Sequence, residues 1–253
     1  MVAAMIARLL LALIVLLGWA PAALATFPVE ASTAQTSEFS ATASPAINIP
    51  SGNAAGNLLI ALANLFNPSN TDPTVSSMTG WTALCSVTNS DTSFSSVTAV
   101  YYKFASGAES NTTYSLSTAI ESATRVLRIT GAHASTPPEC ATNEFTGDFP
   151  NTPSLTPSWG AEDTLFYSIF SKYNGSDSIN AYPTNYIKYQ YNGGGGALPL
   201  QVGTAARELN ATSDDPDGYN LDGAGNGVGI TLAIRPAAAA AATSEADQPI
   251  YFQ

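Results

Sequence analysis

The stretch Thr124-Arg125-Val126-Leu127-Arg128-Ile129-Thr130 follows the period of two that is typical of a β-strand. Residues 96–104 are equally rich in the β-branched and aromatic side chains that favour strands. Further stretches have the same character: 114–117, 164–170, 186–191, 198–202 and 228–234. We predict a strand at each of them.

Residues 58–66 form a mostly apolar run that ends at Asn67-Pro68. A run this short and this apolar is consistent with either a buried strand or a short helix. Elsewhere, turn pairs such as Asp217-Gly218 separate the expected strands, and no long helical period is present. The chain is therefore predicted to be all-β: one domain, at 26–236, built as a two-sheet antiparallel β-sandwich, with jelly-roll connectivity expected.

The two ends of the chain differ in composition from the domain at 26–236. Residues 1–25 carry Arg8, an apolar run and the small-residue ending Ala23-Leu24-Ala25, which is the pattern of a signal peptide. The alternative is an uncleaved membrane anchor. Residues 237–253 begin with alanines and become polar, as in a flexible tail. We expect a protein that is secreted, extracellular or on the cell surface, with no membrane span after signal cleavage.

The net negative charge of the chain argues against nucleic-acid and anionic-lipid partners. Of the 253 residues only 11% are charged, and the formal net charge is −11. An acidic chain repels nucleic-acid phosphates and anionic lipids, and no cluster of Lys or Arg reverses the sign locally. We expect no nucleic-acid partner.

Cys85 and Cys140 are the two cysteines of the chain. In an oxidising compartment a disulfide between them is the default expectation, and two unpaired buried thiols are the alternative.

The order of motifs along the body resembles a β-sandwich, jelly-roll-like domain of phage virion-associated and secreted bacterial surface proteins, most of them uncharacterised. The motifs are 49–52, 56–61, 80–82, 101–105, 129–132 and the final stretch 228–236. Asn57 stands where the pattern usually has Asp. The resemblance implies the sandwich fold and an extracellular or particle-surface setting, and it carries no catalytic residues.

Catalytic signatures are sparse. His133 is the one histidine, and no Gly-x-Ser-x-Gly motif is present, so a serine or cysteine triad has little support. With one histidine and two cysteines, a typical zinc site has too few ligands. Paired-carboxylate glycosidase chemistry remains formally possible from several acids, although the sequence singles out no pair: Glu109, Glu121, Glu144, Asp148, Glu162 and Asp163.

An acidic segment offers oxygen ligands of the kind that calcium binds. It contains Asp214, Asp215, Asp217 and Asp222, but its spacing does not fit an EF-hand. Calcium is therefore a possible cofactor, and a solvated acidic turn is the alternative.

The stretch 172–192 combines tyrosines with amides, a composition suited to stacking on sugar rings and binding their hydroxyls. The candidate ligand-binding residues are Tyr173, Tyr182, Asn185, Tyr186 and Lys188. Strand alternation places Ile187, Tyr189 and Tyr191 on one face, expected to face the core, and Tyr186 and Lys188 on the wetter face. Packing within the sandwich is the alternative use of these tyrosines.

Two functions fit these observations. The first is a non-catalytic extracellular β-sandwich that binds glycan or assembles with itself into a surface or particle structure. The second is a carbohydrate-active enzyme, a glycoside hydrolase or lyase on a jelly-roll fold. We expect the first, because no catalytic motif supports the second.

Overall fold

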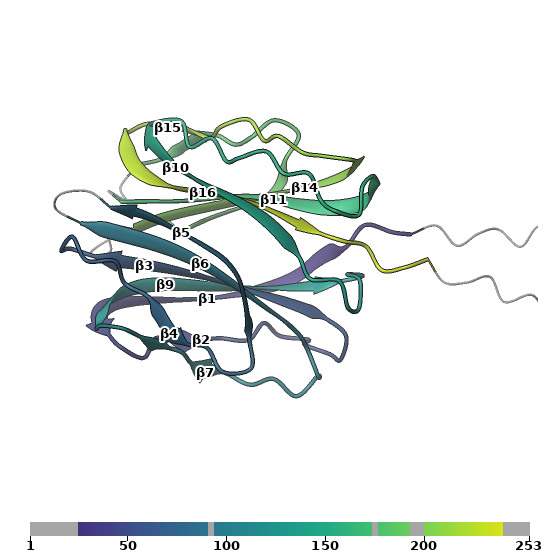
Figure 1. Ribbon diagram of the computed structural model, residues 1–253, viewed down its shortest axis with the longest axis horizontal. Coiled ribbons are helices and arrows are strands. Elements are labelled where there is room, and N and C mark those ends of the chain that lie inside the picture. Colours follow the sequence, from purple (N-terminus) through teal and green to yellow (C-terminus); the bar gives the residue numbers. More distant parts are fainter. Residues whose placement is uncertain (1–24, 91–93, 174–176, 193–199, 240–253) are drawn as a thin grey trace, which may run out of the picture. The chain divides into compact units, whose positions relative to one another are not determined.

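The computed structural model describes residues 25–90, 94–173, 177–192 and 200–239 (Figure 1). Thr26–Ala237 forms one compact unit. The predicted signal peptide and the predicted tail lie almost wholly outside the described residues. Within those residues every regular element is a strand, and no helix is long and apolar enough to cross a membrane.

The first sheet is built from the N-terminal part of the unit. Its strand order is β1-β9-β3-β6-β5, and every neighbouring pair is antiparallel. The strands are β1 (Val29–Thr42), β9 (Ile120–Thr130), β3 (Leu58–Asn67), β6 (Ser95–Phe104) and β5 (Thr82–Ser90).

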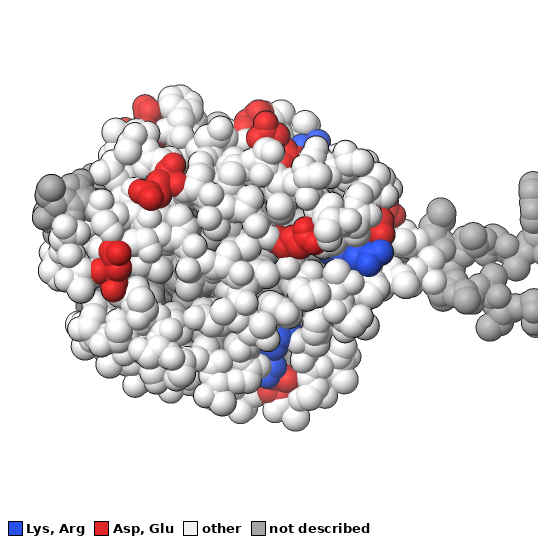
Figure 2. Space-filling model, in the orientation of Figure 1, with Lys and Arg blue, Asp and Glu red and all other residues white. Residues whose placement is uncertain are grey.

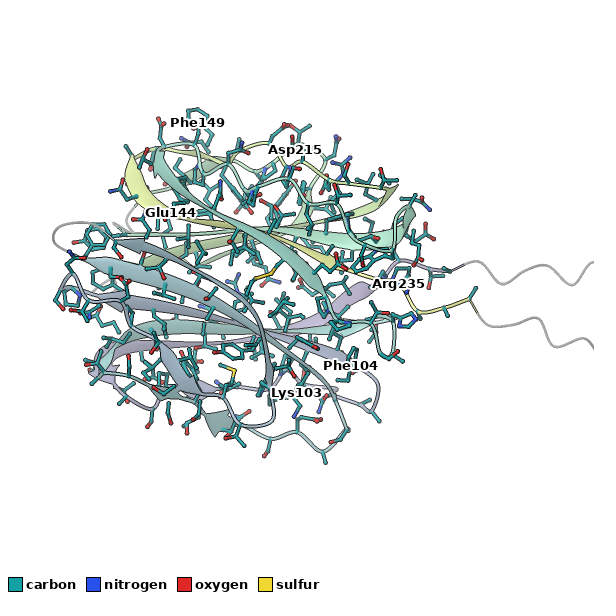
Figure 3. The ribbon with its side chains drawn as sticks, in the orientation of Figure 1. Lys103, Phe104, Glu144, Phe149, Asp215 and Arg235 are labelled. Atoms are coloured by element: carbon teal, nitrogen blue, oxygen red, sulfur yellow. A yellow bond between two sulfur atoms is a disulfide. The ribbon has the colours of Figure 1, made fainter. Side chains whose placement is uncertain are left out.

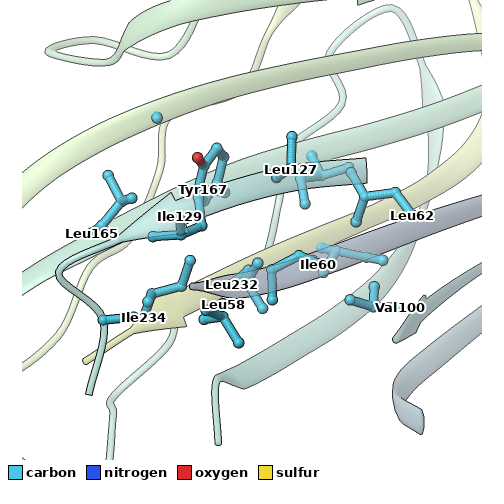
Figure 4. Packing of buried hydrophobic residues seen from close by; sticks show 14 residues of the cluster. Leu58, Ile60, Leu62, Val100, Leu127, Ile129, Leu165, Tyr167, Leu232 and Ile234 are labelled. Carbon is cyan, nitrogen blue, oxygen red and sulfur yellow. The ribbon is translucent and has the colours of Figure 1, made fainter. Parts of the chain in front are cut away.

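The second sheet is built from the C-terminal part, in the antiparallel order β10-β16-β11-β14-β13. The strands are β10 (Glu139–Gly147), β16 (Gly225–Ile234), β11 (Glu162–Tyr173), β14 (Leu200–Ala211) and β13 (Ile187–Asn192). The two sheets pack face to face through a layer of aliphatic side chains that includes Leu58, Ile60, Leu127, Leu165 and Leu232 (Figure 4).

Two-stranded ribbons cover the outer faces of the sheets. The pairs are β2 (Ala46–Ile47) with β7 (Thr112–Thr113), β4 (Val75–Ser77) with β8 (Ser115–Leu116), and β12 (Ile179–Ala181) with β15 (Asn220–Leu221). Ile47, Tyr114 and Leu116 pack against Leu59 and Ala61 on the outer face of β3. Strand β3 is thus buried on both faces, which explains why its sequence is continuously apolar.

A disulfide joins Cys85 of β5 to Cys140 of β10, with 6.7 Å between the Cα atoms (Figure 3). The predicted bond is confirmed. Because β5 and β10 are edge strands of different sheets, the bond links the two sheets along one side of the sandwich.

The predicted all-β, two-sheet antiparallel sandwich is confirmed, and the run 58–66 is a strand. Jelly-roll connectivity is not confirmed. A jelly roll combines two Greek keys across its two sheets. Here residues 29–130 supply the first sheet and residues 139–234 the second, so the chain passes once from sheet to sheet.

Candidate functional site

Two tyrosine rings form a stacked pair beside the edge of the second sheet. Tyr182 follows β12, Tyr189 lies on β13, and their ring centroids are 4.0 Å apart at an interplanar angle of 25°. Tyr182 is half-buried and also meets the buried ring of Tyr219 edge-on at 5.8 Å. Tyr189 is accessible to solvent, because 48% of the residue is exposed. We call Tyr182 and Tyr189 the tyrosine platform.

Hydrogen bonding holds the platform in place. The Tyr189 hydroxyl donates to the backbone carbonyl of Tyr186, and this bond fixes the orientation of the exposed ring. Tyr186 itself is anchored, because its hydroxyl donates to the buried Asp214 carboxylate. The exposed ring is therefore preorganised, which lowers the entropy lost when a ligand binds.

Exposed polar and apolar side chains lie next to Tyr189 in the sequence. Asn185 and Lys188 are exposed, and Ile187 is 52% exposed. The Lys188 ammonium donates to the backbone carbonyl of Glu30 at 3.4 Å, so the start of β1 lies beside β13. A flat aromatic surface on a segment that also exposes an amide and an ammonium group suits a ligand with one apolar face and many hydroxyls.

The predicted face assignment of 186–191 is wrong. Tyr186, expected on the wetter face, is 1% exposed, whereas Ile187 and Tyr189, expected in the core, are exposed. The side chain of Tyr191 lies outside what the structure describes. Backbone geometry is the reason: φ is +66° at Asn185 and +55° at Lys188, and the β13–β14 register shifts between Ile187 and Gln190. Such a bulge breaks the alternation of side chains.

Tyr186 is therefore a buried structural residue. Burial raises the pKa of its phenol well above the usual range, and the hydrogen bond to Asp214 raises it further. The Asp214 carboxylate also pairs with the partly exposed Arg207 at 3.0 Å, so the buried phenol and carboxylate are linked to a guanidinium that reaches the surface.

Tyr173 belongs to another cluster. Its ring stacks on Phe66 and Phe94, with centroids 4.9 and 4.3 Å apart. Of the predicted ligand-binding residues, Tyr182 thus belongs to the platform, Asn185 and Lys188 are exposed on the segment that leads to Tyr189, and Tyr173 packs elsewhere.

The four candidate calcium ligands are not brought together. The Asp214 carboxylate is bound by Tyr186 and Arg207, and the Asp222 carboxylate accepts from the Ser178 amide at 2.7 Å. Asp215 and Asp217 are exposed. Among the described residues, no group of three His, Cys, Asp or Glu side chains is placed to hold a metal ion.

Of the carboxylates considered for glycosidase chemistry, Glu162 and Asp163 are neighbours on β11, and several bind side chains close to them. Glu162 forms a bidentate pair with Arg235 at 2.6 and 2.9 Å, and Glu144 accepts from Asn89 at 3.0 Å. Glu109 accepts from Asn53 at 2.7 Å. Burial alone would raise the pKa of Glu109, but these hydrogen bonds and those from Ser106 outweigh it and lower the pKa well below its usual range.

His133 is held in a turn. Its Nδ1 atom lies 3.1 Å from the Thr136 amide, which donates to it, and 2.9 Å from the Thr136 hydroxyl. In the described part of the chain no carboxylate hydrogen-bonds the ring, so the arrangement that orients a catalytic imidazole is missing there.

Acidic side chains are scattered over the face of the molecule seen in Figure 2, and the few basic ones are not clustered. No family model, curated protein or solved structure matches this chain. The function has to be argued from its own residues.

Strand alternation predicted that Tyr189 and Ile187 face the core, so their exposure was not predicted. The turn residues Pro183-Thr184-Asn185 carried a usable signal, because Asn adopts positive φ more readily than most residues. The positive φ of Lys188 had no such signal, since long side chains seldom adopt it.

Proposed function

We propose that this chain is a non-catalytic extracellular β-sandwich module that binds carbohydrate on the tyrosine platform. The observation that carries the proposal is the stacked Tyr182–Tyr189 pair, whose outer ring is exposed and whose inner ring rests on the core. Buried tyrosines such as Tyr114 and Tyr219 serve packing instead.

The chemistry of the platform favours a sugar over a purely apolar ligand. Pyranose rings present C–H groups on one face, which pack on an aromatic ring, and hydroxyls at their edges. Asn185 and Lys188, exposed close to Tyr189 in the sequence, carry the donors and the acceptor that sugar hydroxyls need. The low charge content of the chain suits a neutral or amide-bearing glycan, and the net charge of −11 disfavours a strongly anionic one.

The enzyme alternative has no comparable support. Glu109, Glu144 and Glu162 each hydrogen-bond to a neighbouring amide or guanidinium group.

A glycan-array screen of the full chain tests the proposal. The native protein is compared with Tyr189→Ala and with Phe149→Ala, a matched control that removes another exposed aromatic ring. Phe149 is 57% exposed and lies beyond the end of β10 (Figure 3). Binding that Tyr189→Ala abolishes and Phe149→Ala retains supports the proposal. No saturable binding by the native protein, or equal loss in both variants, overturns it.

A further inference from the structure

A small cavity lies between the two sheets, beside strand β1. Its lining residues come from strands β1, β3, β9 and β14: Gln35, Asn64, Ala123, Thr124, Arg125 and Val202. The cavity has room for about one water molecule or an ion of similar size. Because Gln35 is exposed, the cavity borders the solvent at this point.

Arg125 is the one charged residue in this lining. It is 4% exposed, and its guanidinium donates to the Thr204 hydroxyl and to the side-chain carbonyl of Gln35, each at 3.0 Å. Both acceptors are neutral. A guanidinium carries five N–H donors, so these two hydrogen bonds leave it able to bind a further acceptor.

The buried Arg125 has no carboxylate partner at ion-pair distance. Each of the four ion pairs in the described part of the chain uses another cation: Lys103, Lys172, Arg207 or Arg235. Glu30 attracts Arg125 from farther away, but its carboxylate already accepts from Tyr167 and Gln190.

This arrangement leaves a cation in the interior without a close counter-charge. Burial lowers the pKa of Arg125, yet a guanidinium stays protonated in proteins. A buried charge costs free energy unless an opposite charge lies beside it. The cavity next to Arg125 is where such a charge can be accommodated.

We propose that this cavity binds one monovalent anion of halide size, such as chloride, against the Arg125 guanidinium. The size of the cavity disfavours polyatomic anions such as phosphate or sulfate. The Gln35 amide nitrogen, which makes no hydrogen bond among the described residues, is a second donor for the anion. The net charge of −11 repels anions at long range, but salt screens that repulsion, whereas the buried guanidinium acts at close range.

The proposed anion would stabilise the sandwich. Arg125 lies on β9 of the first sheet and Thr204 on β14 of the second, so their hydrogen bond joins the two sheets. An anion that neutralises the guanidinium lowers the free energy of the folded state and has no such site in the unfolded chain. The proposal does not depend on carbohydrate binding, and its tests require no glycan.

Thermal unfolding of the full chain, with sodium chloride replacing sodium gluconate at constant ionic strength, tests the proposal. Gluconate is too large for the cavity. We expect the melting temperature of the native protein to rise saturably, by about 3–6 °C when chloride exceeds its Kd tenfold. Arg125→Met should remove this rise. Arg128→Met is the matched control, because Arg128 lies on the same strand but binds Ser32 and Asn57 and does not line the cavity.

A native melting temperature that is equal in the two salts overturns the proposal, and so does a rise that Arg125→Met retains. If Arg125→Met does not fold, crystals of the native protein grown with bromide locate the site. We expect an anomalous peak within hydrogen-bond distance of the Arg125 guanidinium. A water molecule there in place of bromide overturns the proposal. A bromide peak without a chloride-dependent melting temperature means binding at crystal concentration only, which overturns it as well.

Discussion

Cys85 and Cys140 join the edge strands of the two sheets on one side of the sandwich. On the other side no covalent bond is present among the described residues. There Glu30 of β1 binds Tyr167 of β11 and Gln190 of β13, so side-chain hydrogen bonds connect the sheets. One side is thus joined covalently, whereas the other is joined by hydrogen bonds and carries the tyrosine platform.

Replacing both cysteines, as Cys85→Ser with Cys140→Ser, will lower the free energy of unfolding. The bond spans 55 residues, and the chain-entropy model assigns a loop of that length roughly 4 kcal/mol. Urea denaturation of the double variant and of the native protein measures the difference. A loss below about 1 kcal/mol would show that the hydrogen bonds and the core hold the sheets together without the bond.

Removing one buried hydroxyl tests the support beneath the platform. Tyr186→Phe deprives the buried Asp214 carboxylate of a donor and leaves Arg207 as its remaining side-chain partner. We expect a loss of roughly 1–3 kcal/mol in the free energy of unfolding. Tyr102→Phe is the control, because in the described part of the chain the Tyr102 hydroxyl makes no hydrogen bond. Equal losses in the two variants would contradict the role given to the Tyr186–Asp214 bond.

Stability will fall in alkaline solution because several tyrosines are buried. Burial raises the pKa of Tyr114, Tyr167, Tyr186 and Tyr219 above that of the unfolded chain. Above about pH 10 the unfolded state releases these protons and the folded state keeps them, so each tyrosine lowers the free energy of unfolding by about 1.4 kcal/mol per pH unit. Below that pH their contribution is fully present.

Urea denaturation at rising pH, with the ultraviolet absorbance of tyrosinate, checks this dependence. We expect the buried tyrosines to ionise together with unfolding. Gradual ionisation of all tyrosines in a protein that remains folded would contradict it.

Chelation of calcium will leave the melting temperature unchanged. The carboxylates of Asp214 and Asp222 are bound to neighbouring groups, and Asp215 and Asp217 do not converge with them. Calorimetry with EDTA and with added calcium measures this. A calcium-dependent rise in melting temperature, lost in Asp215→Asn, would show that the segment rearranges into a metal site.

The sequence predicted most of the central strands because their residue types are strongly strand-forming. Residues 96–104, 164–170 and 228–234 lie within β6, β11 and β16. The run 58–66 stayed ambiguous because β3 is covered on both faces, which removes the alternation that identifies a strand. The 14-residue β1 was missed because small polar residues dominate its sequence and give no apolar pattern.

The candidate site was predicted in composition but not in orientation. The tyrosines of 172–192 were singled out, yet the positive φ of Asn185 and Lys188 reversed the faces that alternation assigned to Tyr186, Ile187 and Tyr189. Hydrogen bonds between distant residues, such as Tyr186 with Asp214, depend on the packing of β13 beside β14 and are not encoded in local patterns.

The most direct test of the carbohydrate-binding proposal is the dissociation constant of the best array glycan, measured by calorimetric titration for the native protein, Tyr189→Ala and Phe149→Ala. Removing a stacked ring costs about 1–3 kcal/mol in comparable aromatic stacks, so we expect Tyr189→Ala to bind at least about fivefold more weakly. We expect Phe149→Ala to match the native protein. A Tyr189→Ala variant that is folded and binds as tightly as the native protein would contradict the account.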